Sequence, residues 1–222
     1  MSATDTARLP LLCTELRLPS VGNLWPAITE QADRDGWPAA RTLAALFEHE
    51  VAERAQRRTQ RHLAEARLPV GKTLDTFDFT AVPMISKARI AALGHALVDA
   101  GYRVLFTRTT DLVQQLQTAR QELKLAGAIE KLDKYHLIVL DDLSYLQKNQ
   151  AETSVLFELI SARYERRSIM ITANQPFGAW DQIFPDPAMT IATIDRLVHH
   201  SIIFEMNTDS YRRRTAQARK PE

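Results

Sequence analysis

This sequence of 222 residues contains a single cysteine, no long apolar run and almost no net charge. Cys13 is the only cysteine, which excludes an internal disulfide and is typical of a protein in a reducing cytosol. No apolar run approaches the roughly 20 residues of a membrane-spanning helix, and the polar start of the chain does not resemble a signal peptide. The formal net charge is +1, so any surface that binds nucleic acid must be local. We therefore expect a soluble, cytoplasmic protein without a membrane partner.

What the sequence does contain is ordinary for a globular protein, with 45% hydrophobic and 25% charged residues. Residues 1–68 are predicted to form a small helical domain, because apolar residues recur at helical spacing and no strand-like run is present. Residues 69–83, which include Pro69 and Gly71, are predicted as a linker. The length leaves room for one larger domain, residues 84–222.

An arginine stripe lies near the end of the helical domain. Its members are Arg54, Arg57, Arg58 and Arg61. Their spacing of i, i+3, i+4 and i+7 places the four guanidinium groups on one helical face. The stripe could contact the phosphates of double-stranded DNA. It could also be a solvated face, since Glu53 and Glu65 dilute its charge, and the residues alone leave both interpretations open.

From about residue 84 the sequence alternates between helical stretches and short apolar runs. We predict strands at residues 104–107, 137–140, 169–172 and 201–204, and helices at about 87–100, from Thr109 or Thr110 onward, and at about 151–166. The second helix is expected to turn four residues inward: Leu112, Leu116, Ala119 and Leu123. Apolar strands separated by helices are typical of a parallel sheet covered on both faces, so we expect an α/β fold.

Functional groups of such sheets gather at the carboxyl ends of the strands. Asp141 and Asp142 follow the strand at 137–140 and resemble a Walker B motif. In that arrangement the first carboxylate helps to hold Mg²⁺, and the second orients and activates the attacking water. The two acids could instead mark the exit of a buried strand into a turn, because an aspartate after an apolar strand is common in α/β proteins.

Asn174 lies just beyond the next strand. An amide at this place could hydrogen-bond the attacking water or the γ-phosphate, which is the role called sensor 1. Taken alone, an Asx turn before Pro176 is the better interpretation. Arg196 and Arg212 lie further on, and arginines that stabilise the charge of a transferring phosphate contribute strongly to catalysis. A basic C-terminal tail is, however, more often solvated or DNA-facing.

Four longer segments together resemble one known family. They are TLDTFDF at residues 73–79, RVLFTRTTDLV at 103–113, QAETSVLFELISARYERR at 150–167 and DRLVHH at 195–200. These segments are similar to the IstB-like helper proteins of bacterial insertion sequences, AAA+ ATPases that are related to the DnaC-type helicase loaders. The likeness covers about residues 54–219 and is far more specific than a short motif.

This resemblance implies a P-loop NTPase domain of the AAA+ type that assembles on DNA as a homo-oligomer and delivers it to a partner transposase, with ATP and Mg²⁺ as cofactors. It implies that Asp141 is the Walker B metal ligand, that Asp142 occupies the position of the catalytic acid, and that Asn174 is sensor 1. Arg196 would be the arginine finger offered to a neighbouring subunit, and Arg212 the sensor 2 arginine. The arginine stripe would then face DNA.

The P-loop of the family is absent from this sequence. In the family, a strand, a Gly-rich loop that ends Gly-Lys-Ser/Thr and the start of a helix separate the segments that match residues 86–88 and 92–95, whereas here those segments abut. On the order of two to three dozen residues would supply these parts. Without the loop and its lysine the β- and γ-phosphates of ATP lose their cradle, so whether this chain is an ATPase stays open.

Gly71-Lys72-Thr73 looks like the end of a P-loop but lies in the wrong context. Ala66 stands where the motif requires its first glycine, a basic helix precedes the segment instead of a strand, and Pro83 follows where a helix is needed. We therefore interpret this segment as part of the linker.

Loss of the P-loop strand predicts a rearranged sheet. In AAA+ sheets that strand lies between the strand that ends in sensor 1 and the final strand, here residues 169–172 and 201–204. The two neighbours could pair directly, or the final strand could detach and leave three strands. We expect direct pairing, because each buried backbone group without a partner costs about 1–3 kcal/mol.

Three functions are compatible with these observations: an ATP-dependent helper of transposition, a degenerate copy that keeps only DNA and partner contacts, and a replicative helicase loader. His199 and His200 could suggest a metal site instead. No cysteine or acidic residue lies at ligand spacing from them, so we predict a structural role for both.

Overall fold

The computed structural model describes residues 3–69, 87–143, 150–175, 180, 184 and 186–203. The chain divides into two compact units, Met1–Arg61 and His62–Glu222. The division lies inside helix α3 (Ala39–Ala66), whereas the sequence places the end of the helical domain at residue 68. No helix within these described residues is long and apolar enough to cross a membrane.

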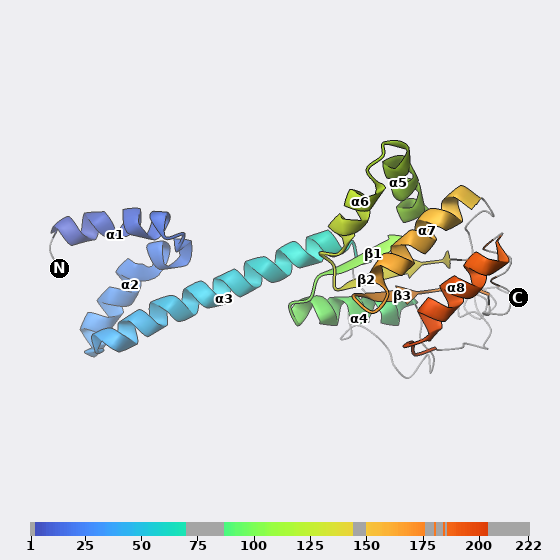
Figure 1. Cartoon of the computed structure of the whole chain (residues 1–222). Helices are drawn as coiled ribbons and strands as arrows, with labels where there is room; N and C mark the ends of the chain where they lie inside the picture. Colours follow the sequence, from blue (N-terminus) through green and yellow to red (C-terminus); the bar gives the residue numbers. More distant parts are fainter. Residues whose placement is uncertain are drawn as a thin grey trace, which may run out of the picture. The chain divides into compact units, whose positions relative to one another are not determined.

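The first unit is helical, as predicted (Figure 1). Helix α1 covers Ala3–Glu15 and α2 covers Pro19–Asp35, and both precede α3. Pro19 suits the first turn of α2, where its missing N–H is no loss. Gly36 ends α2 at φ +64°, a left-handed conformation that glycine adopts without steric cost. All three helices contribute to a small core: Cys13, Val21, Trp25, Ile28 and Leu46.

Among its described residues, the second unit is built on a parallel sheet of three strands in the order β1-β2-β3 (Figure 1). The strands are β1 (Val104–Arg108), β2 (Leu137–Asp141) and β3 (Ser168–Ile171). Every residue of the central strand β2 is buried, which explains its continuous apolar sequence. Arg108 lies opposite Asp141 and Leu140 opposite Ile171, so the three carboxyl ends share one edge. The α/β fold expected from the sequence, with a small helical N-terminal part, is confirmed.

Helices cover both faces of this sheet. They are α4 (Lys87–Asp99), α5 (Thr109–Gln121), α6 (Leu125–Leu132), α7 (Gln150–Arg163) and α8 (Pro187–Val198). Helices α5, α6, α7 and α8 share a core with Leu105, Ile138 and Leu140 on one face of the sheet. Helix α4 packs with Val104 and Val139 on the other face, where Ala66 at the end of α3 joins them.

Leu123 does not take the buried place that the sequence predicts. Helix α5 ends at Gln121, and the Leu123 side chain is 95% exposed. Leu123 has φ +58° in the turn that leads to α6, so helical periodicity no longer sets its direction. Val113, which is 1% exposed, faces the core from α5 instead.

The predicted direct pairing of β3 with the final strand is wrong. Residues 201–203 form no strand, and β3 is an edge of the sheet among the described residues. Phe204 lies outside the described residues. Helix α8 packs with α7 into the core on one face of the sheet, and the described strands correspond to the three-stranded alternative.

Candidate functional site

Polar groups from three elements meet at the carboxyl ends of β2 and β3. Asp141 ends β2 and is 8% exposed. The hydroxyl group of Thr172 donates a hydrogen bond to Oδ1 of Asp141 at 2.8 Å and accepts one from the backbone N–H of Asp142 at 2.8 Å. At the start of α5, the Thr109 hydroxyl donates to the carbonyl oxygen of Asp141 at 3.1 Å. We refer to these four residues as the strand-end cluster.

The backbone at Asp142 makes a sharp turn over the end of β3. Asp142 has φ +66°, a left-handed conformation that aspartate tolerates better than most side chains. The next N–H, that of Leu143, donates to the carbonyl oxygen of Thr172 at 2.9 Å. Two successive N–H groups are therefore bound to Thr172, which fixes how Asp142 leaves the strand relative to Asp141.

Thr109 has a different role from the one predicted. The sequence suggests Thr109 or Thr110 as the cap of α5, but Arg108 occupies the cap position and makes no side-chain cap bond. The Thr109 hydroxyl is fully buried and belongs to the strand-end cluster instead. A helix cap can be predicted from neighbouring residues alone. The bond from Thr109 to Asp141 depends instead on the parallel register of β1 and β2.

The strand-end cluster offers hard oxygen ligands of the kind that Mg²⁺ prefers. The carboxylates of Asp141 and Asp142 would hold such an ion, and the Thr172 hydroxyl already orients the first of them. A cradle for phosphate groups is not formed by the described residues of this edge. Gly71-Lys72-Thr73 lies outside the described residues. The residues present therefore fit the metal better than they fit the nucleotide.

The other predicted catalytic residues are not gathered in one place. Asn174 lies two residues beyond Thr172, and its side chain is exposed. Arg196 lies on α8, where its guanidinium group stands 5.2 Å from the ring centre of Phe157 and donates to a carbonyl oxygen of its own helix. Both of these contacts lie within its own chain. Arg212 lies outside the described residues.

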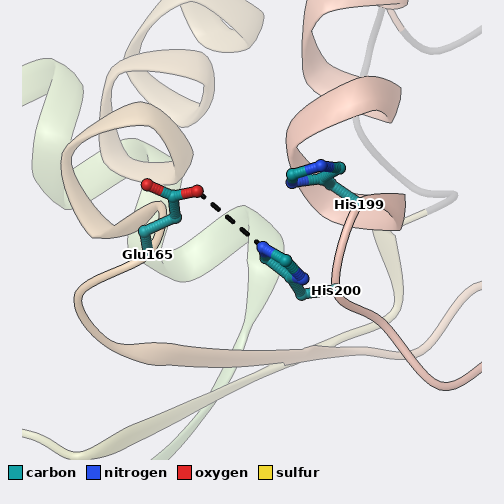
Figure 2. Close-up of side chains that lie close together, drawn as sticks. All are labelled: Glu165, His199 and His200. Carbon is teal, nitrogen blue, oxygen red and sulfur yellow. Dashed lines mark ion pairs between the residues drawn. The ribbon is translucent and has the colours of Figure 1, made fainter.

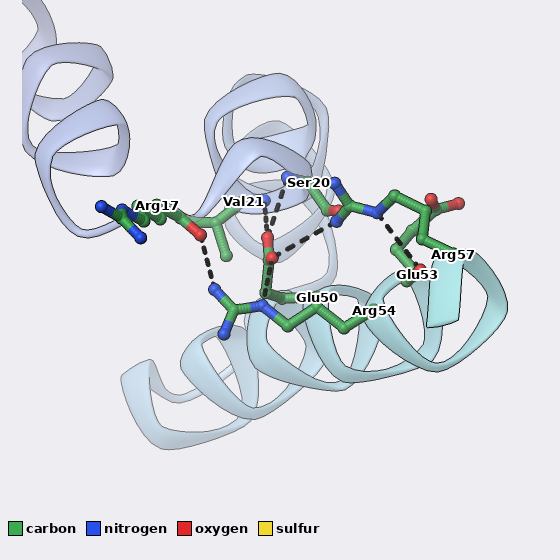
Figure 3. A network of polar contacts seen from close by, with 7 residues as sticks. All are labelled: Arg17, Ser20, Val21, Glu50, Glu53, Arg54 and Arg57. Atoms are coloured by element: carbon green, nitrogen blue, oxygen red, sulfur yellow. Dashed lines mark hydrogen bonds and ion pairs between the residues drawn. The ribbon is translucent and has the colours of Figure 1, made fainter. Parts of the chain in front are cut away.

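Two members of the arginine stripe bind Glu50, which connects α3 to α2 (Figure 3). Nε of Arg54 donates to Oε1 of Glu50 at 2.8 Å, and Nη2 of Arg57 lies 3.6 Å from the same oxygen. Oε2 of Glu50 accepts the backbone N–H groups of Ser20 at 2.8 Å and Val21 at 3.3 Å. These N–H groups belong to the first turn of α2 and have no partner within their helix. Glu50 thus caps α2 from a neighbouring helix.

The charge of Glu50 is maintained by this network. Burial opposes ionisation, but the hydrogen bonds from Arg54, Val21 and Ser20 outweigh it and hold the pKa of Glu50 below its ordinary value of 4.5. Arg54 also donates to the carbonyl oxygen of Arg17. Arg54 is therefore a structural residue of the helical unit.

Arg58 and Arg61 differ from the other two arginines of the stripe. Both are exposed, and neither forms a hydrogen bond or an ion pair within the described residues. Their guanidinium groups are available to an external anion. The predicted stripe therefore divides into Arg54 and Arg57, which are bound to Glu50, and Arg58 and Arg61, which are not.

The fold supplies His199 and His200 with an acidic neighbour that the sequence analysis missed (Figure 2). Oε1 of Glu165 lies 3.8 Å from Nε2 of His200. The hydroxyl oxygen of Tyr164 lies 2.8 Å from Nδ1 of His199. Ligand spacing along the chain gives no signal for this cluster, because α7 and α8 bring its members together from distant positions.

Comparison with known proteins identifies a family. The family model described as IstB-like ATP binding protein matches residues 12–94 and 82–219, which cover most of the chain. The chain belongs to this family. The resemblance carried by the segments at 73–79, 103–113, 150–167 and 195–200 is thereby confirmed.

Curated relatives of this IstB-like chain come from bacterial insertion sequences. It is 60% identical to a putative insertion sequence ATP-binding protein of Sinorhizobium fredii, over 97% of this chain and 83% of the relative. It is 33% identical to the IS5376 putative ATP-binding protein of Geobacillus stearothermophilus, over 93% of this chain and 94% of the relative. It is 32% identical to the IS21 putative ATP-binding protein of Pseudomonas aeruginosa, over 92% of this chain and 88% of the relative.

The alignments to these relatives contain similar numbers of gap positions in the IstB-like chain. The Sinorhizobium fredii alignment spans 246 positions and includes 97% of the 222 residues of this chain. About 30 of its positions are therefore gaps in this chain. The other two alignments, of 236 and 233 positions, leave gaps of about the same size. The two family matches overlap at 82–94, which marks the interruption of the pattern there. The P-loop expected for the family would fall in this stretch.

One solved structure is also similar. The crystal structure of the DnaC helicase loader matches 50% of this chain and 67% of its own chain, with a TM-score of 0.40 and 18% identity. The likeness is too distant to bear on function.

Proposed function

We propose that this IstB-like chain is a helper protein of transposition that binds double-stranded DNA, assembles on it, and recruits or stimulates a partner transposase under the control of ATP. The strand-end cluster is the observation that supports the ATP-dependent part of the proposal, because it orients the carboxylate of Asp141 and fixes the backbone of Asp142 at the edge where parallel sheets bind their ligands. Arg58 and Arg61 support the DNA-binding part, since their charges are free of partners within the described residues.

Each predicted residue has a role in this proposal. Asp141 holds Mg²⁺, and Asp142 orients the attacking water from the turn that Thr172 fixes. When bound, Mg²⁺ neutralises charge on the transferring phosphate. Asn174 acts as sensor 1. The two arginines act in a homo-oligomer: Arg196 as the finger of a neighbouring subunit and Arg212 as sensor 2.

The proposal demands a specific movement of Arg196. Its guanidinium group now stands over Phe157 of the same chain. A finger must reach the phosphate bound to the next subunit, so Arg196 has to leave Phe157 on assembly. Replacement of Phe157 by leucine would therefore weaken the resting contact without removing the arginine.

The gap positions in the alignments, about 30 in all, together with the P-loop expected to be missing, favour a second candidate function. A chain without a phosphate cradle would keep its DNA and transposase contacts and lose its response to nucleotide. Such a degenerate copy would still occupy target DNA through Arg58 and Arg61.

One experiment separates these functions. Duplex DNA binding by the purified chain is measured by fluorescence anisotropy without nucleotide, with ADP and with ATP and Mg²⁺, next to the Sinorhizobium fredii relative. A change of DNA affinity with ATP that Asp142→Asn removes supports the ATP-controlled helper. DNA binding that is the same in all three conditions supports the degenerate copy. If the relative binds DNA and this chain does not, both candidates are wrong.

The genes that lie next to the gene of this chain test the helicase-loader alternative. A helper of transposition is expected to be encoded next to a transposase gene, with that gene immediately upstream. Its absence, together with a neighbouring replicative helicase gene, would favour the loader.

A further inference from the structure

Helices α7 and α8 end near one another, and the residues that follow them form a cluster on the surface (Figure 2). Glu165 comes just after the end of α7, while His199 and His200 come just after the end of α8. One ligand atom of each residue lies within 4.8 Å of those of the other two. Helix carboxyl ends carry a partial negative charge that favours cations.

We propose that Glu165, His199 and His200 together bind one divalent transition-metal ion of the zinc class. Two imidazoles and one carboxylate are a ligand set that Zn²⁺ uses, with water in the fourth position. Imidazole nitrogen also selects against Mg²⁺ and Ca²⁺, which prefer oxygen ligands throughout. The proposed ion is therefore distinct from the Mg²⁺ that the strand-end cluster would hold.

The contact with Tyr164 orients one of the ligands. Its hydroxyl oxygen lies 2.8 Å from Nδ1 of His199. With the phenol oxygen accepting the Nδ1–H, the lone pair of His199 is on Nε2, which is the arrangement that metal-binding histidines usually show.

The distances suit ligands of a common ion better than they suit direct contact. Oε1 of Glu165 and Nε2 of His200 are 3.8 Å apart, which is too long for a hydrogen bond. Two ligand atoms about 2.0–2.1 Å from a tetrahedral Zn²⁺ lie about 3.4 Å apart. All three side chains are exposed, so small rotations can close the remaining distance.

Two nearby arginines are occupied elsewhere and do not compete for the carboxylate. Arg166 pairs with Asp133 at 2.9 Å, and Arg196 stands over Phe157. A bound ion would connect the end of α7 to the end of α8. It would thereby hold in place the helix that carries Arg196.

The test is calorimetric titration of Zn²⁺ into the full chain, freed of any affinity tag and of trace metal by chelation. We expect one ion per chain. Glu165→Gln and His200→Ala should each weaken binding about tenfold or more, and Tyr164→Phe should weaken it less, because that side chain acts through His199. Zn²⁺ should also raise the melting temperature of the chain, and neither ligand variant should show the full rise.

His49→Ala is the matched control, since His49 is also an exposed histidine but lies on α3 in the other unit. It should bind Zn²⁺ like the unchanged chain, and excess Mg²⁺ should not displace the ion. Because the altered side chains are exposed, circular dichroism should show the same helix content in every variant. The proposal is overturned by an absence of Zn²⁺ binding, by binding that Glu165→Gln and His200→Ala leave unchanged, or by an equal loss in His49→Ala.

Discussion

The hydroxyl group of Thr172 donates a hydrogen bond to the carboxylate of Asp141 at 2.8 Å and so joins the ends of two neighbouring strands. It also accepts the N–H of Asp142. We expect Thr172→Val, which keeps the shape of the side chain, to cost about 1–3 kcal/mol in the free energy of unfolding, because a mostly buried carboxylate loses a donor. Denaturant unfolding measures this cost. Thr118→Val, at an exposed threonine of α5, is the control. An equal loss of unfolding free energy in Thr118→Val would show that the bond between Thr172 and Asp141 does not stabilise the fold more than an exposed threonine does.

Nucleotide binding should be far weaker in this chain than in a relative that has an intact P-loop. The missing loop supplies backbone N–H groups and a lysine for the phosphates, and no other segment of the sequence has the required pattern. Titration with a fluorescent ATP analogue and Mg²⁺ compares this chain with the Sinorhizobium fredii relative. Low-micromolar affinity that Lys72→Ala abolished would mean that Gly71-Lys72-Thr73 is a phosphate-binding loop after all.

DNA binding should depend on the two free arginines of the stripe. The double change Arg58→Glu and Arg61→Glu should weaken binding to duplexes of any sequence and lower the slope of affinity against salt by about two, because each phosphate contact releases about one counterion. Salt-dependent anisotropy titrations measure both quantities. The control, Arg8→Glu with Arg34→Glu, makes the same charge change at exposed arginines of α1 and α2. If both double variants behave alike, the stripe is a solvated face.

Acid should destabilise the helical unit through Glu50. Its pKa in the folded chain lies below the ordinary value of 4.5, so its contribution to stability is fully present above that pH. The contribution is lost as the pH falls through the folded pKa, because the unfolded chain then binds more protons. Glu50→Gln should lower stability at neutral pH by about 1–3 kcal/mol and remove this part of the acid sensitivity.

Thermal unfolding followed by circular dichroism, at pH values from about 7 down to 3, tests the role of Glu50. Glu53→Gln is the control, because Glu53 lies on the same helix with an exposed side chain. A pH profile of Glu50→Gln that runs parallel to that of the unchanged chain would contradict the assignment.

Arg163 should be the least replaceable charged residue of the second unit. It is 1% exposed, and its guanidinium group donates to the carbonyl oxygens of Leu132, Tyr135 and Ser168 at 2.9–3.1 Å. Burial lowers its pKa to about 10, while Asp133 acts in the opposite direction, so it stays charged at neutral pH. Arg163→Met should cost about 3–5 kcal/mol, because three carbonyl oxygens and Asp133 lose their partner. Arg166→Met, at an exposed neighbour, should cost far less in the same denaturant titration.

Much of the second unit could be predicted from local sequence. Residues 104–107 and 137–140 are mostly apolar runs. A strand that is buried on both faces requires apolar side chains at nearly every position, so these runs predict buried strands. The position of Asp141 and Asp142 at the carboxyl edge followed from the parallel order of such strands. The family likewise followed from four quoted segments, because a long match is more specific than a short motif.

The remaining features depend on contacts between distant segments. Helical spacing puts four arginines on one face, but only the packing of α2 against α3 shows that Glu50 binds Arg54 and Arg57. Likewise, ligand spacing along the chain hides the approach of Glu165 to His200. Residues 201–203 form no strand beside β3 among the described residues, although their apolar sequence predicts one. Periodicity and motifs therefore determined the elements and the family, whereas long-range packing decided which charged groups are engaged and which are free.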